Sequence, residues 1–80
     1  MDARAALLAA AARRVSADSA EAGMAAIGLD PAIGHPALAA LLAEGLIREP
    51  LRLEAGSLHC TWRLELTPSG RDAARTLTGA

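Results

Sequence analysis

The spacing of hydrophobic positions along the chain changes near Gly45. Before Gly45, apolar residues recur every three or four positions, as on one face of a helix, and beyond it they alternate with polar residues, as in a strand. A last segment after residue 66 returns to the helical spacing. The pattern predicts a small α+β chain with three helices, a two-stranded hairpin and a C-terminal helix.

The first two helices are placed by their caps and inward faces. The first is expected over about Ala3–Val15, with Asp2 as its N-cap. The second starts at Asp18, which stands three places before Glu21 as in a capping box, and ends near Gly28. The inward positions are Leu8, Ala11, Ala12 and Val15 in the first helix and Ala20, Met24 and Ile27 in the second.

The third helix contains two residues that oppose a helix. Asp30 before Pro31 suits an N-cap followed by a first turn, and Gly45 is the expected C-cap. Gly34 and Pro36 lie within this span, and an interior proline removes a backbone hydrogen bond at a cost of about 3 kcal/mol. We therefore expect the regular part of this helix to begin at Pro36.

Two alternating runs predict the hairpin. They cover residues 47–54, where Leu51 and Leu53 alternate with polar residues, and 58–66, and Ala55-Gly56-Ser57 supplies a short turn between them. The apolar face of the second run consists of Leu58, Cys60, Trp62, Leu64 and Leu66. Trp62 is the single aromatic residue of the chain, and we expect it to anchor the core.

The last helix follows the hairpin directly and completes a small core. Thr67 fits its N-cap and Pro68 its first position, and Ala74 and Leu77 share one side. The chain has 80 residues and is 52% apolar, but 21 residues are alanines, so few large side chains remain to fill a core. We expect one domain over residues 1–80, and so small a core favours self-association.

A set of short phrases in this order resembles the winged helix-turn-helix of bacterial transcriptional regulators. They are Ile27-Gly28-Leu29, Gly45-Leu46-Ile47 and Leu66-Thr67-Pro68-Ser69-Gly70-Arg71, with fifteen residues between the first two. The likeness covers about residues 3–78. It implies a third helix that reads DNA, a hairpin wing near the phosphate backbone, and a homodimer joined by the first and last helices.

The positions that read bases in such regulators are nearly bare of polar groups here. The resemblance places Ala32, Ile33, His35, Pro36, Ala39 and Ala40 there, and His35 alone can hydrogen-bond a base. An apolar surface instead favours a protein interface, expected to consist of Ala32, Ile33, Pro36, Ala37, Ala39 and Ala40. The alternative is that some of these residues, the alanines more than Ile33, cover the core of the domain itself.

The charge balance gives little support to strong nucleic-acid binding. Eight arginines face nine acids, there is no lysine, and the net charge is −1. If DNA is bound, phosphate contacts are expected from His35, Arg48, Arg52, His59 and Arg63. Arg71 and Arg75 are four residues apart and are expected on a solvated helix face; the alternative is a modest basic strip with Arg48 that contacts DNA phosphates. Arg13 and Arg14 complement the dipole at the end of the first helix.

The sequence offers no visible equipment for catalysis. His59 and Cys60 are adjacent, so on a strand they point to opposite faces and cannot share a metal ion. We therefore expect no metal, no cofactor and no enzymatic activity. A lone cysteine favours a reducing cytoplasm. The longest apolar run, Ala5–Ala12, is far shorter than the roughly 20 residues of a membrane span, and the arginines after it oppose a secretory signal.

These observations leave two hypotheses of different class. The first is a non-enzymatic winged-helix module that acts through protein contacts, with a protein partner or a second copy on the third helix. The second is a DNA-binding transcriptional regulator that recognises phosphates and shape. The first is favoured because the third helix lacks the side chains that read bases.

Overall fold

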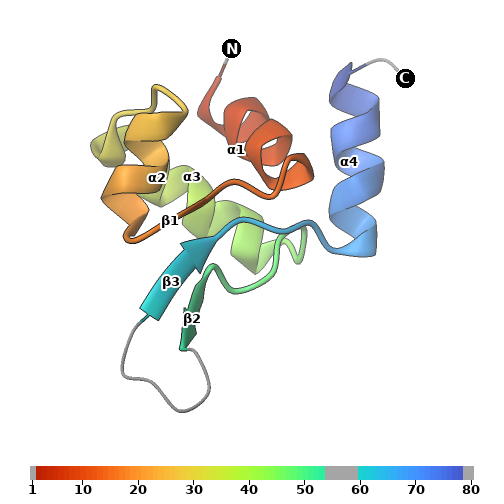
Figure 1. The fold of residues 1–80 in the computed structure, drawn as a ribbon. Coiled ribbons are helices and arrows are strands. Elements are labelled where there is room, and N and C mark those ends of the chain that lie inside the picture. The colour runs from red at the N-terminus through yellow and green to blue at the C-terminus, as the bar shows by residue number, and fades with distance from the viewer. Residues whose placement is uncertain (1, 54–59, 79–80) are drawn as a thin grey trace.

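The fold is a small α+β arrangement in which helices enclose one side of an antiparallel sheet (Figure 1). The structure, a computed structural model, describes residues 2–53 and 60–78. The elements in chain order are α1 (Ala3–Ala12), β1 (Ser16–Ala17), α2 (Ala20–Ala26), α3 (Pro31–Ala43), β2 (Leu51–Leu53), β3 (Cys60–Arg63) and α4 (Pro68–Thr78). The order predicted from the sequence is confirmed, and β1 is an addition that the sequence pattern did not predict.

The sheet has the strand order β1-β3-β2, with both pairings antiparallel. In β3, Trp62 lies between Ala17 of β1 and Leu51 of β2. Toward the other end of the hairpin, Arg63 N–H donates to Pro50 O, Arg48 N–H donates to Glu65 O, and an isolated bridge joins Ile47 to Leu66. The predicted turn over residues 55–57 lies outside the described residues.

The core is centred on Trp62, which is fully buried, as predicted. Around it lie further buried apolar side chains from the helices and from the end of the sheet: Leu7, Leu8, Met24, Leu38, Leu41, Ile47 and Leu64. Ala20 and Ile27 pack against this cluster and Met24 belongs to it, so the predicted inward face of α2 is confirmed. Leu51, by contrast, is 57% exposed and lies outside the core.

Three of the predicted helix caps are confirmed by their hydrogen bonds. Asp2 accepts from Ala5 N–H at 2.7 Å, Asp30 accepts from Ala32 N–H at 3.0 Å, and the Thr67 hydroxyl accepts from the backbone N–H of residue 70 at 3.0 Å. The cap of α2 was assigned one residue too early: Ser19, not Asp18, accepts from the backbone N–H of residue 22, at 3.1 Å. A serine hydroxyl and a carboxylate cap equally well, so composition alone does not separate them.

The first helix is shorter than the sequence predicts. It ends at Ala12, and Arg14 then takes a positive φ of 55° that reverses the chain toward β1. Val15 N–H donates to Ala10 O at 3.1 Å, which closes the helix end. Ala12 is consequently exposed rather than inward, whereas Val15 still packs against the core.

The third helix is continuous from Pro31, so the prediction that it becomes regular only at Pro36 is wrong. Its first turn is fixed by the Asp30 cap, and the Asp30 carbonyl accepts from the N–H groups of Ile33 and Gly34 at 2.9 and 2.8 Å. Gly34 is buried against Met24, where a Cβ would come within 2.6 Å of the methionine sulfur. Pro36 is exposed and forfeits one hydrogen bond, which the packing of this turn offsets.

Within the described ranges, no single helix is both long enough and apolar enough to cross a membrane. The helices α2 and α3 reach such a length and hydropathy only when taken together across a bend of 104°.

Candidate functional site

The first candidate surface is the outward side of α3, referred to below as the α3 face. It consists of exposed apolar residues: Ala32, Ile33, Pro36, Ala39 and Ala40. Ile33 is 58% exposed, and it and Leu51 are the exposed large hydrophobic residues of the described chain. The sixth residue predicted for this surface, Ala37, is instead half-buried against the core, so for Ala37 the core-covering alternative is the correct one.

The position of the α3 face follows from the helical period. Gly34, Leu38 and Leu41 are buried against the rest of the domain, which turns the positions between them outward. Because those outward positions hold alanine, isoleucine and proline, the helix presents short side chains to solvent and few groups that hydrogen-bond. Such a surface allows another polypeptide to approach the helix closely.

The charges around the α3 face are acidic rather than basic. Neither α2 nor α3 contains a lysine or an arginine. His35, the one group there that could bond a base, has its Nε2 3.7 Å from Oε1 of Glu21 on α2. A DNA phosphate laid against these two helices would meet Glu21 and Asp30 without a guanidinium or ammonium partner.

An ion pair on the surface ties the end of α3 to α1. Arg4 donates from both terminal nitrogens to the Glu44 carboxylate, one of these bonds measuring 2.7 Å. The Arg4 guanidinium lowers the pKa of Glu44, and the hydrogen bond to Glu44 raises the pKa of Arg4. Both side chains are close to half exposed, so the pair is screened by solvent and contributes modestly to stability.

The residues predicted for phosphate contact do not gather on the α3 face. Arg63 is exposed on β3 with its guanidinium 3.9 Å from the Glu65 carboxylate, and Arg48 follows α3 with its backbone N–H donating to Glu65 O at 3.0 Å. Arg52 lies in β2, paired with Thr61. His59 lies outside the described residues.

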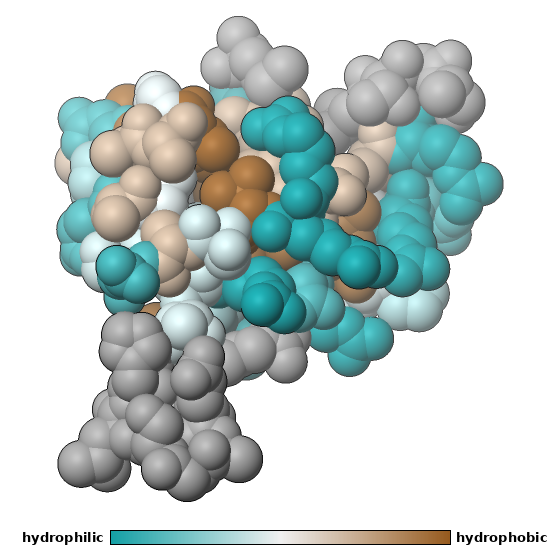
Figure 2. Space-filling view, in the orientation of Figure 1, coloured by the Kyte–Doolittle hydropathy of each residue, from teal (hydrophilic) through white to brown (hydrophobic). Residues whose placement is uncertain are grey.

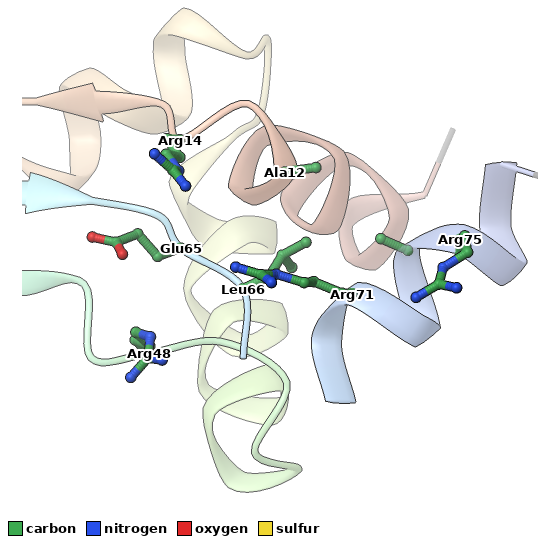
Figure 3. Close-up of a pocket in the computed structure, with 8 residues that line it drawn as sticks. Ala12, Arg14, Arg48, Glu65, Leu66, Arg71 and Arg75 are labelled. Atoms are coloured by element: carbon green, nitrogen blue, oxygen red, sulfur yellow. The ribbon is translucent and has the colours of Figure 1, made fainter. Parts of the chain in front are cut away.

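The second candidate surface is an open pocket of about 520 Å³. It is lined by Ala12, Arg14, Arg48, Glu65, Leu66, Arg71, Ala74 and Arg75, and is called the arginine groove below. Figure 3 shows Arg71 extending from α4 toward Leu66, with Arg14 and Arg48 on either side of the segment that carries Glu65. In the space-filling view, strongly hydrophilic side chains cross this part of the molecule beside a hydrophobic patch (Figure 2).

Arg48, Arg71 and Arg75, the residues of the alternative basic strip, line this groove together with Arg14. The sequence predicts for Arg14 only a place at the end of a helix, where a basic residue complements the helix dipole. Its positive φ is the feature that distinguishes it from Arg13, and a backbone angle has no counterpart in a hydrophobic pattern.

Backbone hydrogen bonds bring the walls of the groove together. The Thr67 hydroxyl donates to Gly45 O at 2.6 Å, and Thr67 N–H donates to Leu46 O at 3.1 Å, which joins the end of α3 to the start of α4. Direct packing of α1 against α4 supplies the third wall. The groove is therefore built from segments that lie far apart in the sequence.

Together these features define a small α+β domain with four helices and an antiparallel sheet in its described part, an apolar helix face and an arginine-lined groove. Comparisons with protein-family models, with curated proteins and with solved structures give no match. The described residues also contain no group of three or more His, Cys, Asp or Glu side chains placed to hold a metal ion.

Proposed function

We propose that this chain is a non-enzymatic module of winged-helix type that binds a protein partner through the α3 face. The observation that carries the proposal is the pairing of a 58% exposed Ile33 with two helices, α2 and α3, that hold no basic residue. A helix that read DNA would need side chains that bond base edges and cations that contact phosphates. A protein interface needs an apolar centre with a polar rim, which Ile33 and the surrounding Glu21, Asp30 and His35 supply.

A second copy of the chain is the first partner to test, because a small core gains stability when apolar surface is buried between subunits. The helices α1 and α4 are a weaker choice for that contact. The exposed residues of α4 whose side chains are described are polar apart from Pro68, and the buried residues of α1 already pack inward. The α3 face is the larger apolar surface that the described residues leave open.

The matched pair Ile33→Asp and Leu51→Asp tests this proposal. Both residues are exposed to the same degree, 58% and 57%, so both variants are expected to fold, but Leu51 lies on β2 away from the α3 face. Sedimentation equilibrium should show self-association that Ile33→Asp abolishes and Leu51→Asp leaves intact. If wild type is monomeric, a photo-crosslinking residue at Ala40, compared with one at Leu51, tests for a different protein partner. Equal crosslinking from both positions would refute the assignment to α3.

Direct DNA binding is the second candidate function, and the exposed cations Arg48 and Arg63 favour it. Under this alternative, Arg63→Ala should weaken binding to duplex DNA at low salt and reduce the slope of affinity against salt by nearly one unit, about 0.9 per phosphate contact. Fluorescence anisotropy over a salt series measures both quantities. An unchanged slope excludes Arg63 as a phosphate contact.

A further inference from the structure

The arginine groove is the strongest feature of the described chain that the proposed function leaves unused. Four of its eight lining residues are arginines, and its one acid is Glu65, so the lining carries four positive charges and one negative charge. The Glu65 carboxylate also lies 3.9 Å from the guanidinium of Arg63, a cation outside the lining. The lining is thus strongly positive in a chain whose net charge is −1.

The three arginines at the centre of the groove are left without acidic partners. Arg4, Arg63 and Arg75 each lie within ion-pair distance of a carboxylate, on Glu44, Glu65 and Asp72. No ion pair or side-chain hydrogen bond, by contrast, joins Arg14, Arg48 or Arg71 to the rest of the described residues. Like charges that line one pocket without partners repel one another, and a bound anion reduces that repulsion.

Arg14 reaches the groove from the end of α1. It occupies the left-handed position that ends α1, where glycine is the residue without strain. The Arg14 side chain carries one of the three guanidinium groups that have no acidic partner among the described residues.

We propose that the arginine groove binds the phosphate groups of a nucleotide. Guanidinium groups bond phosphate oxygens through two parallel N–H donors, and several of them around one pocket match a group that carries several charges within a few ångströms. An acidic peptide carries one charge per carboxylate, spread along its backbone, and matches this cluster less well. The volume of about 520 Å³ lies in the range of small-molecule sites.

The groove is lined by charged residues and by apolar residues. Ala12, Leu66 and Ala74 provide apolar surface on which a sugar or base can lie. Glu65 stands at the sheet end and repels phosphate, so the phosphates are expected nearer to Arg71 on α4. The ligand is either a free nucleotide or the backbone of a nucleic acid, since both present the same phosphate chemistry.

Calorimetric titration of the full chain at low salt tests the proposal with four probes: pyrophosphate, adenosine triphosphate, a short DNA oligonucleotide and a polyglutamate peptide. Saturable binding of pyrophosphate and the triphosphate identifies a free nucleotide as the ligand. Binding of the oligonucleotide alone, with an affinity that falls steeply with salt, identifies a nucleic-acid backbone. Either result supports the proposal, whereas no binding by any phosphate probe, or equal affinity for polyglutamate, overturns it.

Two arginine variants distinguish binding in the groove from non-specific electrostatic attraction of the phosphate probe. Arg71→Gln removes a guanidinium from the groove lining. It should lower the affinity for the phosphate probe that binds wild type roughly 10-fold, the usual effect of losing one charge-assisted hydrogen bond. Arg13→Gln makes the same change of charge next to Arg14 but outside the groove lining, and should change affinity less than about 2-fold through distant screened charge alone. Equal losses in the two variants would overturn the site. The result of the Arg71→Gln titration does not depend on whether the α3 face binds a protein, because that proposal is tested separately with Ile33→Asp.

Discussion

Replacing Arg14 with glycine should make the protein more stable while weakening phosphate binding. Arg14 has a φ of 55°, and its N–H donates to Ala11 O at 3.1 Å as part of the closure of α1. In this conformation the Cβ of any L-residue crowds the following carbonyl, whereas glycine has no Cβ. Arg14→Gly therefore preserves the backbone hydrogen bonds and removes both the strain and the side chain.

The magnitude follows from two opposing terms. Relief of left-handed strain contributes about 1 to 2 kcal/mol, and the greater freedom of glycine in the unfolded chain cancels about 0.5 to 1 kcal/mol of it. The central values of the two terms leave a net gain of about 0.75 kcal/mol. For a domain of this size that gain corresponds to a rise in Tm of about 3 to 6 °C. Arg14 has no acidic partner among the described residues, so no ion pair is lost in exchange.

The matched control is Arg13→Gly, which makes the same chemical change one residue earlier. Arg13 has a right-handed φ of −88°, so glycine there relieves nothing and should lower stability by about 0.5 to 1 kcal/mol. Urea and thermal denaturation, followed by circular dichroism and by the fluorescence of the single tryptophan, measure both variants. A destabilised Arg14→Gly, or a shift of the same sign in both variants, would refute the reasoning. Calorimetric titration with the phosphate probe that binds wild type should show a loss of affinity for Arg14→Gly and none for Arg13→Gly.

Two further predictions concern packing and pH. Gly70→Ala places a Cβ 1.8 Å from Leu46 O, a backbone atom that no rotamer change can move, so denaturation should show a loss of stability of about 3 kcal/mol or more. The control Gly28→Ala is strained at φ 72° but lies in open space, so it should lose less stability. A larger loss for Gly28→Ala than for Gly70→Ala would contradict the contact at Gly70. Glu44→Gln should reduce stability at neutral pH, because Arg4 lowers the folded-state pKa of Glu44 and the pair therefore stabilises the fold above the unfolded-state pKa. The difference from wild type should disappear as the pH falls through that lowered pKa, and a difference that persists in acid would exclude the ion pair as its cause.

The parts of the fold that the sequence predicts are those with a local cause. Asp2, Asp30 and Thr67 cap helices through bonds to residues two or three places away, so a short window of sequence contains both partners. Trp62 lies in a run of strictly alternating residues, and its burial follows from that alternation. The order of elements required no long-range information.

The features that the sequence does not predict depend on contacts between distant segments. The strand Ser16–Ala17 is two residues long, too short to show a period, and it exists because Arg63 and Trp62 pair with it from β3. The helix α3 continues through Pro36, and within the same turn Gly34 packs against Met24 of another helix, a contact that a local pattern does not contain. In both cases tertiary contacts override the local preference.

The arginine groove illustrates the same limit for function. Each of its arginines has an ordinary local explanation, such as a complement to a helix dipole or a solvated helix face, and their number is unremarkable in a chain of net charge −1. Only the packing of α1 against α4 and the bonds from Thr67 to the end of α3 bring four of the eight arginines around one pocket. The helices α2 and α3 hold none of them. Because the α3 face and the groove share no residue, a protein on the first leaves the cations of the second available, and phosphate binding in the groove does not require α3 to read DNA.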